Sequence, residues 1–214
     1  MKHAEVPRLR GGPAARGAWL LGGLFVFAIG IVCLYESKLG LSPWDVLNQG
    51  ISKHSPLSFG ESNILVGCCV LGLAVVLGAR IGLGTVMNAV LIGAFVDQLL
   101  RIGAVTRLAH DSLGVRIALL AAGVAVMGLA TGLYVGAGFG AGPRDSLMLS
   151  LVRLTRVRVG VVRGLLEAAA TAAGFVLGGT VGIGTLVFVL AIGPAVEASF
   201  ALLGRAPFSR AAAA

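Results

Sequence analysis

The stretch GLSPWD, residues Gly40–Asp45, decides the fold because its pattern, Gly-x-x-Pro-x-Asp, returns one hundred residues later as GAGPRD, Gly140–Asp145. In each copy the glycine can end one helix. The proline, Pro43 or Pro143, fits the first turn of a new helix, where its missing N–H is not needed. Each copy therefore predicts a break followed by the start of a new helix, and the repetition indicates that the chain contains one structural unit twice.

The composition is that of an integral membrane protein. Of the 214 residues, 57% are hydrophobic and only 12% are charged, and the mean hydropathy is +0.96, which lies outside the range of soluble domains. A net charge of +8 would raise the question of nucleic acid in a soluble protein. Here the basic residues fall at the ends of apolar runs, where they orient helices across a bilayer. We therefore expect the lipid bilayer as a partner and no nucleic acid.

Hydropathy predicts six membrane-spanning helices, each about the length needed to cross roughly 30 Å of hydrocarbon. The apolar runs lie near residues 17–36, 62–79, 84–101, 115–136, 160–178 and 184–203. A polar segment divides them into three and three. The expected regions are a basic N-terminal segment (1–16), a first three-helix repeat (17–101), a linker (102–114), a second three-helix repeat (115–203) and a short C-terminal tail (204–214).

The two halves align without a gap when the chain is shifted by one hundred residues. Besides the motif, Gly60 matches Gly160, and GARIGLGT (78–85) matches GGTVGIGT (178–185). Turn glycines in register are hard to obtain by chance. Because three spans per half is an odd number, the second half must be inverted relative to the first. The sequence predicts an all-α membrane protein with six transmembrane helices as an inverted 3+3 repeat, each half carrying one short interfacial or re-entrant helix.

The basic residues set the expected orientation. With the N-terminus inside, most Lys and Arg residues fall in cytoplasmic segments, as the positive-inside rule requires. We expect the plasma membrane as the location, with both termini cytoplasmic.

The short helix after the first motif cannot cross the bilayer. The roughly ten residues between Pro43 and Pro56 cover ~15 Å, half the hydrocarbon thickness. Ser42 is a natural N-cap, and Asp45 then faces the positive end of the helix dipole. Two interpretations of the repeated aspartate stay open. It is a helix cap, or, since the motifs of an inverted repeat approach from opposite faces, Asp45 and Asp145 line a shared central pathway.

Three further residues are candidates for that pathway. Arg144 precedes the second aspartate and is expected either to pair with Asp145 or to bind an anion, and Trp44 takes its place in the first copy. Glu167 lies inside the fifth apolar run, where a lone acid is a functional candidate. The alternative for Glu167 is a structural ion pair with Arg163, one turn earlier.

Two glycine-rich turns, GLGT and GIGT, precede the third and sixth spans. Their glycines allow a tight hairpin and their threonines can cap the next helix. The alternative is a backbone that lines a substrate path, as in transporters with broken helices. The residues concerned, with the motif positions, are Gly40, Pro43, Gly82, Gly84, Thr85, Gly140, Pro143, Gly182, Gly184 and Thr185.

At the paired Gly-x-x-Pro-x-Asp motifs and the GxGT turns, the chain resembles the YczE-type membrane proteins, which are similar to the wider YitT-like group. The resemblance extends from about residue 18 to residue 203. It implies an integral membrane class. It implies no activity and leaves the substrate open.

Three functions fit these features. The first is a transporter or permease for a small molecule or ion, with its pathway between inverted repeats. The second is a substrate-capturing subunit that needs an energising partner, and the third is a membrane scaffold or assembly factor without transport. We expect no enzyme, because no nucleophile lies at a suitable spacing from a histidine and an acid. We expect no cofactor and no metal site, because the histidines share no ligand spacing. Small residues on many helix faces would allow a homo-oligomer as readily as packing within one chain.

Overall fold

The computed structural model describes residues 8–9, 12–102, 112–204 and 209–210. Within these ranges six helices are long and apolar enough to cross a membrane, which confirms the six spans expected from hydropathy. They are α1 (Pro13–Ser37), α3 (Phe59–Val76), α4 (Leu83–Leu100), α6 (Leu113–Gly136), α8 (Val159–Val176) and α9 (Ile183–Gly204). Their bounds lie within a few residues of the apolar runs.

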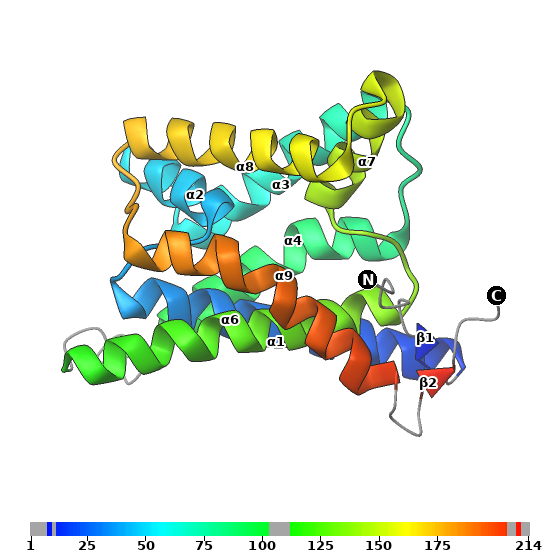
Figure 1. Cartoon of the computed structure of the whole chain (residues 1–214), viewed down its shortest axis with the longest axis horizontal. Coiled ribbons are helices and arrows are strands. Elements are labelled where there is room, and N and C mark those ends of the chain that lie inside the picture. Colours follow the sequence, from blue (N-terminus) through cyan, green and yellow to red (C-terminus); the bar gives the residue numbers. More distant parts are fainter. Residues whose placement is uncertain (1–7, 10–11, 103–111, 205–208, 211–214) are drawn as a thin grey trace.

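Each proline of the repeated motif begins a short helix, as the sequence predicts. Helix α2 (Pro43–Lys53) has 11 residues and α7 (Pro143–Thr155) has 13, so neither can span the bilayer. Each packs mainly against a helix of the other half, α2 against α8 and α7 against α3. The two short helices lie toward opposite ends of the molecule (Figure 1).

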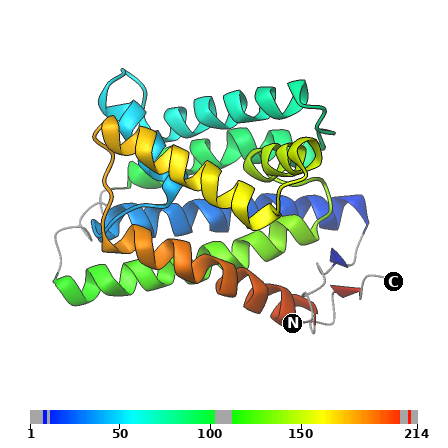
Figure 2. The ribbon, with the colours of Figure 1, turned by 45° about the horizontal axis from the view of Figure 1, so that its top comes forward.

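The two long helices α1 and α6 make the most extensive helix–helix contact in the described part of the molecule. They lie side by side along much of their length (Figures 1 and 2). Glycines permit this approach. A Cβ at Gly23 would lie 2.8 Å from the backbone nitrogen of Tyr134, and a Cβ at Gly123 would lie 2.9 Å from Leu34 Cγ. Helix α4 packs on α1, and α9 packs on α6.

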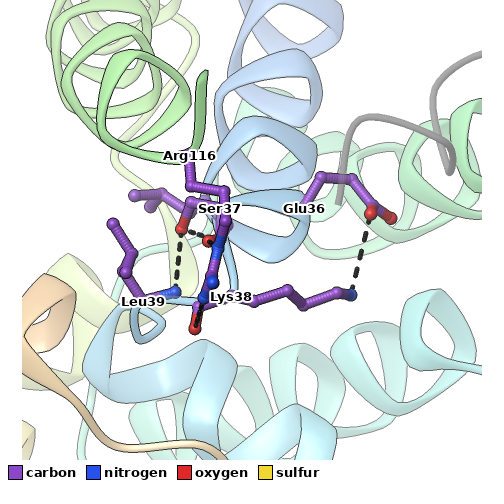
Figure 3. Close-up of polar contacts among 6 residues, drawn as sticks. Glu36, Ser37, Lys38, Leu39 and Arg116 are labelled. Carbon is purple, nitrogen blue, oxygen red and sulfur yellow. Dashed lines mark hydrogen bonds and ion pairs between the residues drawn. The ribbon is translucent and has the colours of Figure 1, made fainter. Parts of the chain in front are cut away.

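Two arginines one hundred residues apart form equivalent contacts. Each lies near the start of one long helix, α1 or α6, and donates to carbonyls at the end of the other. Arg116, near the start of α6, donates from Nε to Ser37 O (2.8 Å) and from Nη2 to Lys38 O (2.9 Å) at the end of α1 (Figure 3). Arg16, near the start of α1, donates from Nε to Ala137 O (2.8 Å) and from Nη2 to the next carbonyl (3.1 Å). Unpaired carbonyls at a helix C-terminus are good acceptors for a cation. We call these two contacts the arginine clasps.

Each motif loop also packs on the glycine-rich turn of the other half. Gly84 N donates to Phe139 O (2.9 Å), and Gly184 N donates to Leu39 O (2.8 Å). These bonds join the loop that precedes each short helix to the start of a span in the opposite half. The hairpin turns therefore hold the two halves together.

The opening glycines of the motifs are required by the backbone. The φ angle is 130° at Gly40 and 120° at Gly140, a region that favours glycine. A Cβ at Gly40 would lie 2.8 Å from Thr185 Oγ1, and one at Gly140 would lie 2.7 Å from Thr85 Oγ1. Neither position has room for a side chain.

The threonines of the GxGT turns cap their helices, as expected, but from within the first turn and not as the N-cap residue. Helix α4 begins at Leu83, with Gly82 as the N-cap residue. Thr85 is the third helical residue, and its Oγ1 accepts from Gly82 N at 3.4 Å. The same contact joins Thr185 and Gly182 at 3.3 Å. The threonine side chain satisfies a backbone N–H at the helix start from inside the first turn.

The two halves differ in how their last two spans pack. In the first half α3 and α4 are in close contact, and Gly60 and Gly93 face each other with no room for a side chain on either. Asp97 on α4 accepts from Gly60 N at 2.8 Å and so caps α3. In the second half α8 and α9 make few contacts, and a Cβ at Gly160 or Gly193 would meet nothing within 4 Å.

Two short strands join the ends of the described chain. Strand β1 (Arg8–Leu9) pairs antiparallel with β2 (Ser209–Arg210). Both ends therefore lie at the same end of the molecule (Figure 1), as an even number of spans requires. The expected N-terminal segment (1–16), linker (102–114) and tail (204–214) each extend beyond the described residues, so that division stays a prediction.

Candidate functional site

A cavity of about 590 Å³ lies between the two halves. The first turns of both short helices line it, residues 42–44 on α2 and residues 142–145 on α7. The six spans supply the remaining walls, which are largely apolar and include Phe27, Val70, Ile92 and Phe188. The two motifs, far apart in the sequence, thus meet at one cavity.

Asp45 lies inside the first turn of α2. Its side chain is fully buried and is not among the cavity-lining groups. Ser42 is the N-cap of α2, as predicted, and donates from Oγ to Asp45 Oδ2 (2.5 Å), while Asn48 Nδ2 donates to Asp45 Oδ1 (3.2 Å). Burial raises the pKa of Asp45, and the charge of Arg144 and these two hydrogen bonds oppose the rise.

Arg144 and Trp44 hold equivalent motif positions and meet at the cavity. The guanidinium of Arg144 lies 5.1 Å from the centre of the Trp44 ring, within the range of a cation–π contact. In the described part of the chain Arg144 forms no hydrogen bond and no ion pair, so the expected pair with Asp145 is not formed. Arg144 lines the cavity with its guanidinium against an aromatic face, and its charge also acts on the buried carboxylate of Asp45.

Asp145 and Glu167 also line the cavity, together with Arg163 and Tyr134. Arg163 Nε lies 2.9 Å from Glu167 Oε1, so the ion pair weighed from the sequence is present and forms part of the cavity wall. Burial raises the pKa of Asp145; Arg163 and, less strongly, Arg144 oppose this rise, and Glu167 adds to it. The second motif therefore supplies charged groups to the cavity, and the first supplies a serine, a proline and a tryptophan.

Sequence reasoning missed several polar residues of the cavity wall, among them Asn63, Asn88 and Tyr134. Asn63 is 6% exposed, and its Nδ2 has no hydrogen-bond partner. A signal was present, because each of these residues interrupts an apolar span. Asn63 is also the repeat partner of Arg163, so the same depth in the two halves carries a polar group.

Comparisons with known proteins establish the family. Residues 14–200 match a family of unknown function (DUF6198). The chain belongs to this family. It is 35% identical over 188 residues to an uncharacterized protein of Haemophilus influenzae, covering 88% of this chain and 84% of that one. It is 33% identical over 180 residues to the uncharacterized membrane protein YczE of Bacillus subtilis, covering 83% and 82%. No solved structure matches the chain.

These relatives confirm the resemblance to YczE-type proteins and, with the six apolar helices, a multi-pass membrane protein. Large apolar side chains such as Val176 (83% exposed) and Leu190 (69%) cover the outer faces of the spans, as contact with lipid requires. The cavity places charged and amide groups on the inside of this apolar shell. Ionisable groups inside a bundle of membrane-spanning helices are costly to bury.

Proposed function

We propose that this protein is a transporter or permease for a small solute, built as an inverted 3+3 repeat, with both termini cytoplasmic in the plasma membrane. The repeat is supported by contacts that recur with an offset of one hundred residues. The two arginine clasps, the two loop-to-turn hydrogen bonds and the crossed packing of α2 and α7 all come in such pairs. Each pair exchanges the roles of the two halves, as a pseudo-two-fold axis would. We also propose that the chain is related to the wider YitT-like group.

The observation that carries the transport proposal is the cavity between the halves. Both short helices begin at it, and charged residues of α7 and α8 line it. Discontinuous helices that start at a cavity near the middle of the bilayer are the usual construction of solute sites in inverted-repeat transporters. A membrane scaffold would not need charged groups around such a space.

The unequal packing of the halves supplies a mechanism. In inverted-repeat transporters the two halves adopt different conformations and exchange them to open the site to each side in turn. Here α3 and α4 are in close contact at Gly60 and Gly93. The equivalent positions of α8 and α9, Gly160 and Gly193, are not in contact. In the exchanged state α8 and α9 close, and Glu197, the repeat partner of Asp97, caps α8.

Reconstitution of the purified chain alone into liposomes tests the function. Uptake or counterflow of labelled organic acids, amino acids and monovalent ions is measured in a background with Cys33, Cys68 and Cys69 changed to Ala. Met148→Cys places a thiol in the cavity wall, and Leu149→Cys places one on the exposed face of the same helix. A bulky methanethiosulfonate reagent should block flux through Met148→Cys and leave Leu149→Cys unaffected.

Two other results would replace this proposal. Solute binding without flux, restored when a second membrane component is added, would make the chain a substrate-capturing subunit. Neither binding nor flux of any solute tested would favour the scaffold. Catalysis is not part of the proposal.

A further inference from the structure

Two helix N-termini converge on the central cavity. The first turns of α2 and α7, helices of 11 and 13 residues, both line it. The N-terminus of a helix carries a partial positive charge and unpaired N–H groups, which favour an anion. On α2 Ser42 Oγ accepts from Asp45 N (3.4 Å), and the Asp45 carboxylate lies in the first turn. On α7 the N-cap is Gly142, which supplies no side-chain cap.

A cation without an acceptor lies beside these helix starts. In the described ranges Arg144 makes neither a hydrogen bond nor an ion pair, and its guanidinium rests on the Trp44 ring. The other arginine of the wall, Arg163, is engaged by Glu167 at 2.9 Å. Arg144 therefore has five N–H donors available to a ligand.

An amide donor without a partner completes the polar part of the wall. Asn63 is 6% exposed and its Nδ2 makes no hydrogen bond. A buried donor without a partner costs free energy, and a ligand with an acceptor group in the cavity would remove that cost. The guanidinium favours an anionic acceptor, and the amide can donate to any acceptor group, including a carboxylate.

The rest of the wall limits the ligand to one charged group. Side chains such as Val70, Ile92, Met127 and Phe188 make most of the lining apolar. A single free guanidinium suits one carboxylate better than a multiply charged phosphate. The wall also carries acids: Glu167 pairs with Arg163, Asp145 interacts with the charges of both Arg163 and Arg144, and Glu197 is exposed.

We propose that the cavity binds a small organic carboxylate, with the carboxylate held by Arg144 and Asn63 and an apolar body against the span helices. This inference deepens the transport function proposed above and rests on it for its biological meaning. The binding itself is measurable without transport.

Tryptophan fluorescence can report the binding, because Trp44 lies under Arg144. The chain has two tryptophans, so Trp19→Phe leaves Trp44 as the single one. The probes are hexanoate, hexanamide and hexylammonium, which share a chain length and differ in charge. Hexanoate should bind the detergent-purified protein at least about tenfold more tightly than either of the others, because only the carboxylate forms charge-assisted hydrogen bonds with Arg144.

Variants assign the selectivity to the named residues. Arg144→Gln should weaken hexanoate binding by at least about tenfold and leave hexanamide unchanged. Asn63→Ala should weaken hexanoate by about threefold. Arg153→Gln is the matched control, because Arg153 is on the same helix and bonds to Gly78 O and Ser150 Oγ outside the cavity lining. It should leave both affinities unchanged.

Equal affinity for hexanoate and hexanamide, tighter binding of hexylammonium, or no hexanoate binding at all would overturn the proposal. So would an Arg144→Gln protein that binds hexanoate like the parent. The three-probe comparison needs no variant at Arg144, so a variant that fails to fold leaves the test intact. Hexanoate binding in a protein that moves no solute would remove the transport function and keep the site. Flux of a cation without hexanoate binding would remove the carboxylate site and keep the transport function.

Discussion

At the scale of single residues, the two motif aspartates have the same sequence pattern and different surroundings. Asp45 accepts from Ser42 and Asn48 and is shut off from the cavity. The second motif has glycine and methionine at the positions of these two partners, and Asp145 lines the cavity. The cap interpretation suits Asp45, and the pathway interpretation suits Asp145. This difference could be read from the sequence, at the positions three residues before and three residues after each aspartate.

Replacing Asp45 should affect stability more than flux. Asp45→Asn keeps an acceptor for one of its two donors and should lower the free energy of unfolding by about 1 kcal/mol, whereas Asp45→Ala leaves both donors buried without an acceptor and should cost about 1–3 kcal/mol. Thermal unfolding in detergent ranks the stabilities of the parent and the two variants. Liposome flux should persist in the Asn variant. An Asn variant with unchanged stability and no flux would place Asp45 in the pathway instead.

Asp145 should make the stability depend on pH. Because burial raises its pKa in the folded protein, the folded state holds a proton that the unfolded chain loses near the usual carboxyl pKa of about 3.9. Its contribution to stability is therefore full below that value and is lost as pH rises through the raised pKa. Melting temperatures from pH 4 to 8 should fall less steeply in Asp145→Asn than in the parent. Identical slopes in Asp145→Asn and the parent would show that this carboxyl is ionised throughout.

At the scale of helices, the arginine clasps show what hydropathy could not predict. The basic residues at the ends of the apolar runs indicate the orientation of helices, but their acceptors are backbone carbonyls whose positions depend on the folded structure. Arg116 reaches the end of α1 from the start of α6 (Figure 3). The breaks at the motif prolines were predictable, because proline and glycine act locally. The crossed packing of α2 on α8 and α7 on α3 was not, because nothing local selects the partner.

Removing a clasp should destabilise the protein. Arg116→Gln loses two hydrogen bonds from a charged donor to the end of α1, at a cost of about 1.5–3 kcal/mol. Arg80 is exposed and makes no hydrogen bond among the described residues, so Arg80→Gln should stay within about 0.5 kcal/mol of the parent. Thermal or denaturant unfolding in detergent compares the two. Equal stability of the two variants would mean that the clasp is dispensable.

At the scale of the whole molecule, composition and periodicity predicted the six spans and the two short helices, because bilayer thickness fixes the length of a span. They did not predict that α3 and α4 pack closely while α8 and α9 are apart. Gly60 and Gly160 are the same residue at the same repeat position, yet one is enclosed and the other is open. The proposed transport mechanism assigns this difference to a conformational state, which no local sequence signal would reveal.

The inverted arrangement predicts which ends of the short helices face each side of the membrane. In a cysteine-free background, Ser55→Cys after α2 should react with an impermeant maleimide added outside intact cells. Thr155→Cys at the end of α7 should react only after permeabilisation, because the repeat places it on the cytoplasmic side. Labelling of both positions from the same side would rule out the inverted repeat.

The central claim is that the halves exchange conformations, and one flux measurement tests it most directly. Gly160→Ile adds a side chain outside the cavity lining, where nothing lies within 4 Å, but the repeat partner, Gly60, has no room for one in the closed pair. Gly164→Ile is the matched control, since Gly164 is equally open and its partner in the closed half is already Ile64. Both variants should melt like the parent, and in liposomes Gly160→Ile should lose flux while Gly164→Ile keeps it. Equal flux through the two variants would contradict the exchange of conformations and, with it, this account of transport.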